Sequence, residues 1–155
     1  MQSVKDIDNT FRNIVDEHQT IQAYYTNTTK EVDIDKMTID KYPLLYAGCS
    51  GAQINGGYVE FRYEVIIGDL VVEEQSDDLV EVYSETLLLM QDVIAKFELA
   101  LSTQAGGTVN HEWSFELPVD CTPFTSRFDN LLTGWSGNFT IRIPNVVDLC
   151  DALYP

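Results

Sequence analysis

Residues 58–70 read YVEFRYEVIIGDL and carry the strongest strand signal in the chain. Glu60, Arg62 and Glu64 alternate with apolar and aromatic residues, so that the two kinds of side chain point to opposite faces of a strand. One wet face and one dry face are typical of an antiparallel sheet covered on one side only. The consecutive isoleucines at 66 and 67 break the alternation and indicate burial on both faces, or a bulge, at that end.

A long helix is predicted after this strand, from Asp78 to Ser102. Asp78 and Glu81 have the spacing of a capping box, and acidic residues suit the positive end of the helix dipole. One apolar stripe of this helix consists of Leu79, Val82, Thr86, Met90, Val93, Phe97 and Leu101. A second apolar face holds Val80, Leu87, Leu88 and Ala95. Since a helix lying on one sheet cannot bury both faces, the second one is expected either to be sandwiched within the fold or to meet another subunit.

An amphipathic helix is predicted at the N-terminal end, over residues 3–20, because apolar residues recur there at steps of three and four. His18 lies on its apolar stripe, where a hydrogen-bonded structural role and a catalytic role are both open. Residues 21–42 are predicted to be extended, with a short strand at 21–26 and a period-two segment at 32–35.

The rest of the chain supplies further strands. The predicted elements are a buried strand at 44–49, a glycine-rich hairpin loop at 48–57, a strand at 109–119, a loop at 120–130, a strand at 131–143 that Gly134 and Gly137 break, and a short helix at 146–153. This order indicates an α+β fold, with a mainly antiparallel β-sheet packed against a long central helix and the amphipathic N-terminal helix. We expect one domain over 1–155, with the N-terminal helix at 3–20, the extended segment at 21–42, the sheet and long helix at 43–143 and a C-terminal tail at 144–155.

The chain is strongly acidic, with 9 Lys and Arg against 25 Asp and Glu and a formal net charge of −16. Its 45% apolar and 11% aromatic residues are enough for a buried core, which argues against disorder. The charge argues against wrapping duplex DNA and against docking on an anionic membrane. No basic residue occurs between Arg62 and Lys96. That acidic segment is open to three interpretations: a solvated face, the lining of a channel that repels a polyanion, or an imitation of DNA.

No catalytic, metal-binding or cofactor motif is present, and we expect no enzyme and no cofactor. The acidic pair at 33 and 35 resembles the start of a calcium loop, but Met37 replaces a ligand and no Glu closes the loop. The two histidines do not have zinc-site spacing. A Cys49–His111 pair is not favoured, because Cys49, Cys121 and Cys150 fit small buried thiols in a reducing compartment. The N-terminus has no signal-peptide pattern, and no apolar run reaches the roughly 20 residues that span a bilayer.

Several of these features occur together in an informative order. An amphipathic helix leads to an extended segment ending at Tyr42-Pro43, then to the aromatic-rich strand at 58–69, an acidic turn and a helix over 82–101. Strands follow with Trp113 and with Trp135-Ser136-Gly137. Over residues 3–145 this order resembles the small α/β tail-terminator and head–tail neck (connector, tail-completion) proteins of tailed bacteriophages.

The resemblance implies a structural virion protein, made in the host cytoplasm, that forms a hexameric or dodecameric ring in the neck or at the top of the tail. Such a ring joins the portal or adaptor to the tail tube and lets DNA pass through an acidic lumen. The expected lumen or loop contacts are Glu73, Glu74, Asp77 and Asp78. The expected subunit interface is Val80, Leu87 and Leu88. The alternatives are an acidic DNA-mimic protein that inhibits a basic nucleic-acid-binding partner, and a small-ligand or enzyme domain.

Overall fold

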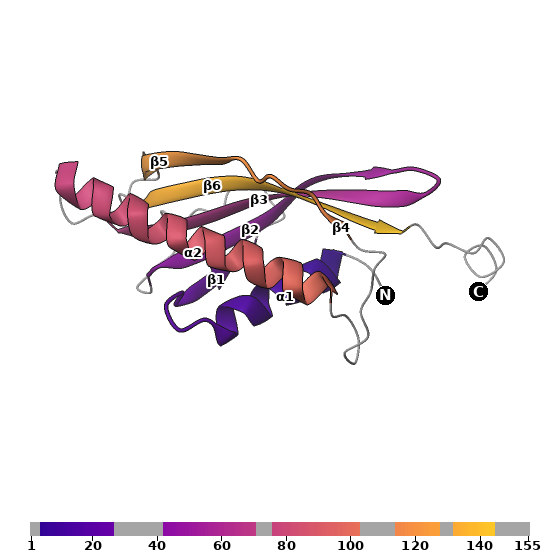
Figure 1. The fold of residues 1–155 in the computed structure, drawn as a ribbon, viewed down its shortest axis with the longest axis horizontal. Coiled ribbons are helices and arrows are strands. Elements are labelled where there is room, and N and C mark those ends of the chain that lie inside the picture. Colours follow the sequence, from indigo (N-terminus) through magenta and orange to yellow (C-terminus); the bar gives the residue numbers. More distant parts are fainter. Residues whose placement is uncertain (1–3, 27–41, 71–75, 103–113, 128–131, 145–155) are drawn as a thin grey trace.

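The computed structural model describes residues 4–26, 42–70, 76–102, 114–127 and 132–144, without the side chains at 76, 77, 101, 102, 126 and 127. These residues form an α+β structure with one mixed sheet of six strands and two helices, which confirms the predicted class (Figure 1). The elements along the chain are α1 (Val4–Glu17), β1 (Ala23–Tyr25), β2 (Leu44–Ile54), β3 (Tyr58–Leu70), α2 (Ser76–Ser102), β4 (Ser114–Phe115), β5 (Cys121–Arg127) and β6 (Leu132–Pro144).

The sheet is built around β3, the strand that the sequence marks most clearly. The strand order is β1-β2-β3-β6-β4, and β5 lies beside β6 on the same side as β4. β3 pairs with β6 over its whole length, from Tyr58 opposite Pro144 to Leu70 opposite Leu132. All strand pairs are antiparallel except β1 with β2, which run parallel. The connection from β1 to β2 therefore makes the sheet mixed.

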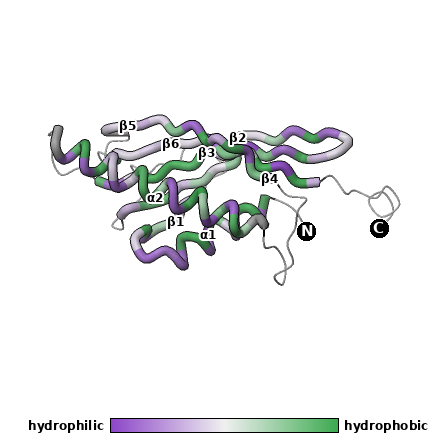
Figure 2. The backbone as a smooth tube through the Cα atoms, viewed as in Figure 1, coloured by the Kyte–Doolittle hydropathy of each residue, from purple (hydrophilic) through white to green (hydrophobic). Residues whose placement is uncertain are grey.

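Both helices pack against one face of the sheet, and hydrophobic and hydrophilic residues alternate along them (Figure 2). On α1 the buried residues are Ile7, Phe11, Ile14 and Val15, which fall on one side of a helix. Alternate residues of β3 meet them, as the period-two pattern predicts. Phe61, Tyr63, Val65 and Ile67 belong to the same buried cluster.

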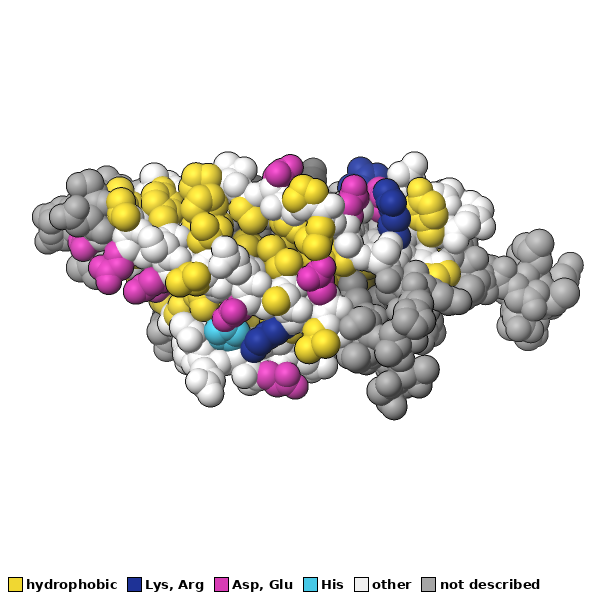
Figure 3. All heavy atoms as spheres, in the orientation of Figure 1, with side chains coloured by type: hydrophobic (Ala, Val, Ile, Leu, Met, Phe, Trp, Pro, Cys, Tyr) yellow, Lys and Arg dark blue, Asp and Glu magenta, His cyan; other side chains and the backbone are white. Residues whose placement is uncertain are grey.

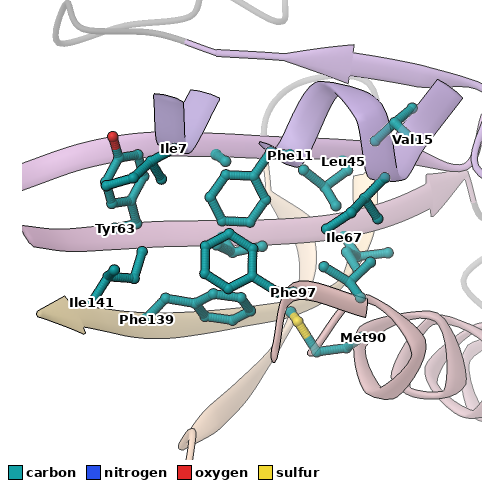
Figure 4. Close-up of a cluster of buried hydrophobic side chains, with 14 of the residues drawn as sticks. Ile7, Phe11, Val15, Leu45, Tyr63, Ile67, Met90, Phe97, Phe139 and Ile141 are labelled. Carbon is teal, nitrogen blue, oxygen red and sulfur yellow. The ribbon is translucent and has the colours of Figure 1, made fainter. Parts of the chain in front are cut away.

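Three phenylalanine rings hold the two helices and the sheet together (Figure 4). Phe11 of α1 stacks on Phe97 of α2, with ring centroids 4.6 Å apart. Phe139 of β6 lies 5.8 Å from each of them. All three side chains are fully buried. Aromatic pairs at these separations add stability beyond the area they bury, so this triad is the joint between the two layers.

The opposite face of the sheet is divided into a charged part and an apolar part. Glu60 accepts a hydrogen bond from Nε of Arg142 at 3.0 Å and pairs with Nε of Arg62 at 3.5 Å. At the other end of the sheet, Leu44 and Leu132 are fully buried beneath partly exposed aromatic residues. The buried isoleucines at 66 and 67 lie at this end, where both faces of β3 are covered.

α1 ends at Glu17, three residues earlier than predicted, because His18 turns the chain. Its Nδ1 accepts hydrogen bonds from the backbone N–H groups of Thr20 at 3.0 Å and Ile21 at 3.2 Å. The neutral ring then carries its proton on Nε2, which donates to Asp92 of α2 at 3.2 Å. His18 is thus a hydrogen-bonded structural residue, with a side chain only 7% exposed.

The β2–β3 hairpin is longer than predicted. The glycine-rich segment 48–57 was expected to be a loop, but β2 continues to Ile54 and only 55–57 form the turn. The side chain of Asn55 closes this turn, since its Oδ1 accepts hydrogen bonds from the N–H groups of Gly57 and Tyr58. Gly51 lies at the bulge of β2, where glycine is common.

The C-terminal half of the sheet also differs from the prediction. Of the strand expected at 109–119, only Ser114–Phe115 is a strand in the described residues, and the loop expected at 120–130 contains β5. Pro123 lies within this segment, and proline is tolerated in β5 because β5 is an edge strand in the described sheet.

The glycines at 134 and 137 do not interrupt β6. Gly134 lies opposite Gly68, and a Cβ atom at position 134 would collide with the carbonyl oxygen of Ile67. The close approach of β3 and β6 therefore requires glycine at this position. The period-two segment predicted at 32–35, an edge strand or an extended arm, and the helix predicted at 146–153 lie outside the described residues.

The phenylalanine triad gives a first prediction. We expect Phe97→Ala to lower the free energy of unfolding by about 3–5 kcal/mol, because it removes a fully buried ring from between two helices and the sheet. Urea denaturation followed by circular dichroism measures the change. Glu98→Ala, which changes the exposed neighbour, is the control and should stay within about 0.5 kcal/mol of the unmodified protein. Equal effects of the two substitutions would contradict the role of the triad.

The turn at His18 gives a second prediction. We expect His18→Ala to cost about 1–3 kcal/mol, because the N–H groups of Thr20 and Ile21 lose their acceptor. His18→Asn should recover part of this loss, since the amide oxygen of asparagine can take the place of Nδ1. Denaturation gives the free energy of unfolding of both variants and of Asp92→Asn. The comparison separates the loss of the Nδ1 acceptor from the loss of the contact with Asp92 in α2. If His18→Ala and His18→Asn are equally stable, Nδ1 does not stabilise the turn as an acceptor.

Candidate interaction site on helix α2

The first part of α2 lies at the margin of the hydrophobic core. The buried side of the helix begins at Thr86 and continues through Met90, Val93 and Phe97. Among the described side chains of residues 78–85, none is fully buried. The predicted inward stripe is therefore correct from Thr86 to Phe97, whereas Leu79 and Val82 of the same stripe are only partly buried.

An exposed apolar surface runs along α2 and consists of Val80, Leu87 and Leu88, here called the α2 apolar surface. Val80 is 63% exposed and Leu88 is 62% exposed. Leu87 is half-buried, and since it lies seven residues after Val80 it falls on the same side of the helix. Figure 3 shows hydrophobic side chains gathered along one border of α2. The second apolar face is therefore not enclosed by the part of the fold that the structure describes.

Acidic residues occupy the other border of α2 and form a surface here called the acidic flank. Its members are Asp78, Glu81, Glu85 and Asp92. Their spacings of three, four and seven residues place them along one side of the helix, where Figure 3 shows a row of carboxylates. No Lys or Arg occurs among residues 78–92 to neutralise them. Asp78 lies near the positive end of the helix dipole, where an acidic residue is favourable, whereas Glu81 and Glu85, four residues apart, repel each other.

Of the four acidic residues expected at a lumen or in a loop, the structure describes Asp78 fully and Asp77 by its backbone. Asp78 is half-buried in the first turn of α2. Asp77 lies in the same turn by its backbone, and its side chain is outside the description. Glu73 and Glu74 lie outside the described residues. The structure therefore brings Asp78 together with Glu81, Glu85 and Asp92, of which the last three were not among the expected contacts.

A contact that the sequence does not reveal holds this part of α2 on the sheet. The indole Nε1–H of Trp135 in β6 donates a hydrogen bond to the backbone carbonyl of Tyr83 at 2.9 Å. The rings of these two residues meet edge to face, with centroids 5.9 Å apart. Thr86, one turn further on, donates its hydroxyl to the carbonyl of Val82 at 2.6 Å. Trp135 was predicted only as a strand residue, because its partner is 52 positions away.

The residues considered for catalysis and metal binding are not assembled into a site in the described part of the chain. Cys49 and Cys121 are both partly buried free thiols, and burial raises the pKa of Cys121. The hydroxyl of Tyr63 is buried close to Cys49, and burial raises its pKa. No group of three potential metal ligands occurs among the described residues. Cys150, His111 and the acidic pair at 33 and 35 lie outside them.

No protein-family model matches this chain, and no curated protein matches it significantly. In the described residues, neither helix combines the length and the apolar character that crossing a membrane requires. The α2 apolar surface and the acidic flank are thus the features of this structure from which a function can be inferred.

The Trp135 contact gives a third prediction. We expect Trp135→Phe to lower the free energy of unfolding by about 1–2 kcal/mol, because the substitution removes the hydrogen bond to Tyr83 but keeps an aromatic ring. Hydrogen exchange should become faster in residues 79–87 and stay unchanged in α1, which is the internal control. Equal acceleration in both helices would show that Trp135 stabilises the fold as a whole and not α2 in particular.

Proposed function

We propose that this chain is a non-enzymatic structural subunit that assembles with copies of itself through the α2 apolar surface. In this proposal the assembly is a hexameric or dodecameric ring in the neck or at the top of the tail of a bacteriophage. The ring joins the portal or adaptor to the tail tube. The exposure of Val80 and Leu88 supports the self-assembly. The segment order described above supports the assignment to a phage.

The size of the α2 apolar surface fits a contact within a closed ring. Burying one exposed Val or Leu side chain contributes about 1.5–3 kcal/mol. Three of them contribute at most about 4.5–9 kcal/mol, which is similar to the roughly 4–15 kcal/mol that association costs and leaves little net affinity. A single pair of copies joined only here would be weak. In a ring each subunit makes the contact twice and closure makes the last contact intramolecular, so weak individual contacts suffice.

The acidic flank supports a surface that faces DNA without retaining it. DNA is retained by Lys and Arg, which displace its counterions, and among residues 78–92 there is none. In the proposal Asp78 lines the passage together with the expected residues Glu73, Glu74 and Asp77. Repulsion between these carboxylates and phosphates keeps the DNA moving.

The acidic flank also favours a second candidate, a DNA-mimic protein that occupies a basic nucleic-acid-binding partner. From Asp78 to Asp92 the row is about 21 Å long at 1.5 Å per residue, which is long enough to imitate several phosphates. The ring is preferred because a DNA mimic does not require the α2 apolar surface beside its charges.

The proposed function gives a fourth prediction. We expect the purified chain to form a multimer at micromolar concentration and Leu88→Ser to lower its mass, because the substitution removes an exposed apolar contact. Light scattering after size-exclusion chromatography measures the mass. Leu117→Ser is the matched control, since Leu117 is also exposed, at 52%, but lies outside α2. Both variants should keep the circular dichroism spectrum of the unmodified protein, which shows that they are folded.

A chain that stays monomeric at every concentration, and that is absent from phage particles, would overturn the ring. Under those conditions the DNA mimic would be supported by tight binding to a basic nuclease that weakens steeply with salt. Glu81→Gln with Glu85→Gln should then weaken that binding, whereas Leu88→Ser should leave it unchanged.

A further inference from the structure

The outer edge of β2 is unpaired over most of its length in the described structure. β1 pairs with β2 only at Leu44, Leu45 and Tyr46. From Ala47 to Ile54, β2 has β3 on one side and no described strand on the other. Figure 1 shows this half of the β2–β3 hairpin extending beyond both helices. Its end is open to solvent, with Ile54 75% exposed.

This edge has little of the protection that strand edges of soluble proteins usually carry. Such edges are guarded by charged side chains, by proline, by a bulge or by a cover. No charged residue occurs from Tyr42 to Val59, the longest uncharged run of a chain with a net charge of −16. The protective device on the described edge is the bulge between Cys49 and Gly51. The edge segment is neutral throughout, and its residues are small except for Gln53 and Ile54.

The opposite side of the sheet is guarded, and this determines which partner the β2 edge can take. There β4 is two residues long, and β5 carries Pro123 in its middle. Because proline has no N–H group, a strand added beside β5 would lose a hydrogen bond there. The β5 edge of another copy is therefore a poor partner for β2. The β2 edge of another copy is a good one, since it is equally neutral and no like charges face each other.

We propose that two copies of this chain join their sheets by antiparallel pairing of β2 with β2 over residues 47–54. The contact is isologous, with the same edge on both copies, and is distinct from the α2 apolar surface. It rests on the proposed self-assembly only in that both involve copies of the chain. Because the contact is two-fold, it gives a dimer by itself.

Hydrogen exchange of the intact chain at several concentrations tests this pairing. Amides within 47–54 should be protected at high concentration and should exchange at least tenfold faster on dilution, since the partner strand belongs to another copy. Ala52→Lys should abolish the protection, because lysine guards natural strand edges, whereas Ala52→Thr, which suits a strand, should keep it. Circular dichroism of both variants establishes that they are folded.

Each result decides the pairing. Protection that does not change with concentration would show that the chain covers its own edge, and absence of protection at every concentration would show that copies do not pair there. Loss of protection in both variants, or in neither, would place the contact elsewhere. Leu88→Ser separates this proposal from the ring: it should leave a dimer in which 47–54 remain protected. If the ring proposal is wrong, that dimer should still form.

Discussion

The stacking of Phe11, Phe97 and Phe139 is the contact on which the rest of this structure depends. It joins one residue from each helix to one from β6, and none of these residues is near another in the sequence. Buried rings in contact on several sides tolerate little displacement, because interiors are packed as densely as organic crystals. The triad therefore fixes where α2 crosses the sheet, and with it which side of α2 is left outside.

A sheet with helices on one face has a limited capacity to cover a helix as long as α2. The core receives residues from Thr86 to Phe97, while Val80 and Leu88 remain outside. Trp135 holds the earlier turns of α2 to β6 by a single hydrogen bond and an edge-to-face ring contact. The α2 apolar surface and the acidic flank are thus held in place by the sheet without being covered by it. That combination is what a contact surface requires, since a mobile helix would lose conformational entropy on binding.

The proposed self-assembly of so acidic a chain would have to overcome repulsion between its copies. Repulsion falls off over a Debye length of about 8 Å at physiological ionic strength, so contacts are favoured where no charge lies close by. The β2 edge fulfils this condition in part: its own residues carry no charge from Tyr42 to Val59, while the charged residues nearest to it lie on the adjacent strand β3. The α2 apolar surface fulfils it less completely, because the acidic flank lies on the same helix. In the two proposals, salt would therefore strengthen the α2 contact more than the β2 contact.

The sequence by itself determined the elements with a strong period: α1, β3, α2 and β6 were each predicted within a few residues of their observed bounds. It also determined the second apolar face of α2, since helical periodicity follows from local geometry alone. Only the tertiary structure decided that β5 is a strand despite Pro123, that β2 extends to Ile54, that His18 ends α1 and that Trp135 anchors α2. In each case the deciding partner is an adjacent strand or a hydrogen-bonding group brought close by folding. Local patterns do not encode such neighbours, because their effect arises only when distant segments pack together.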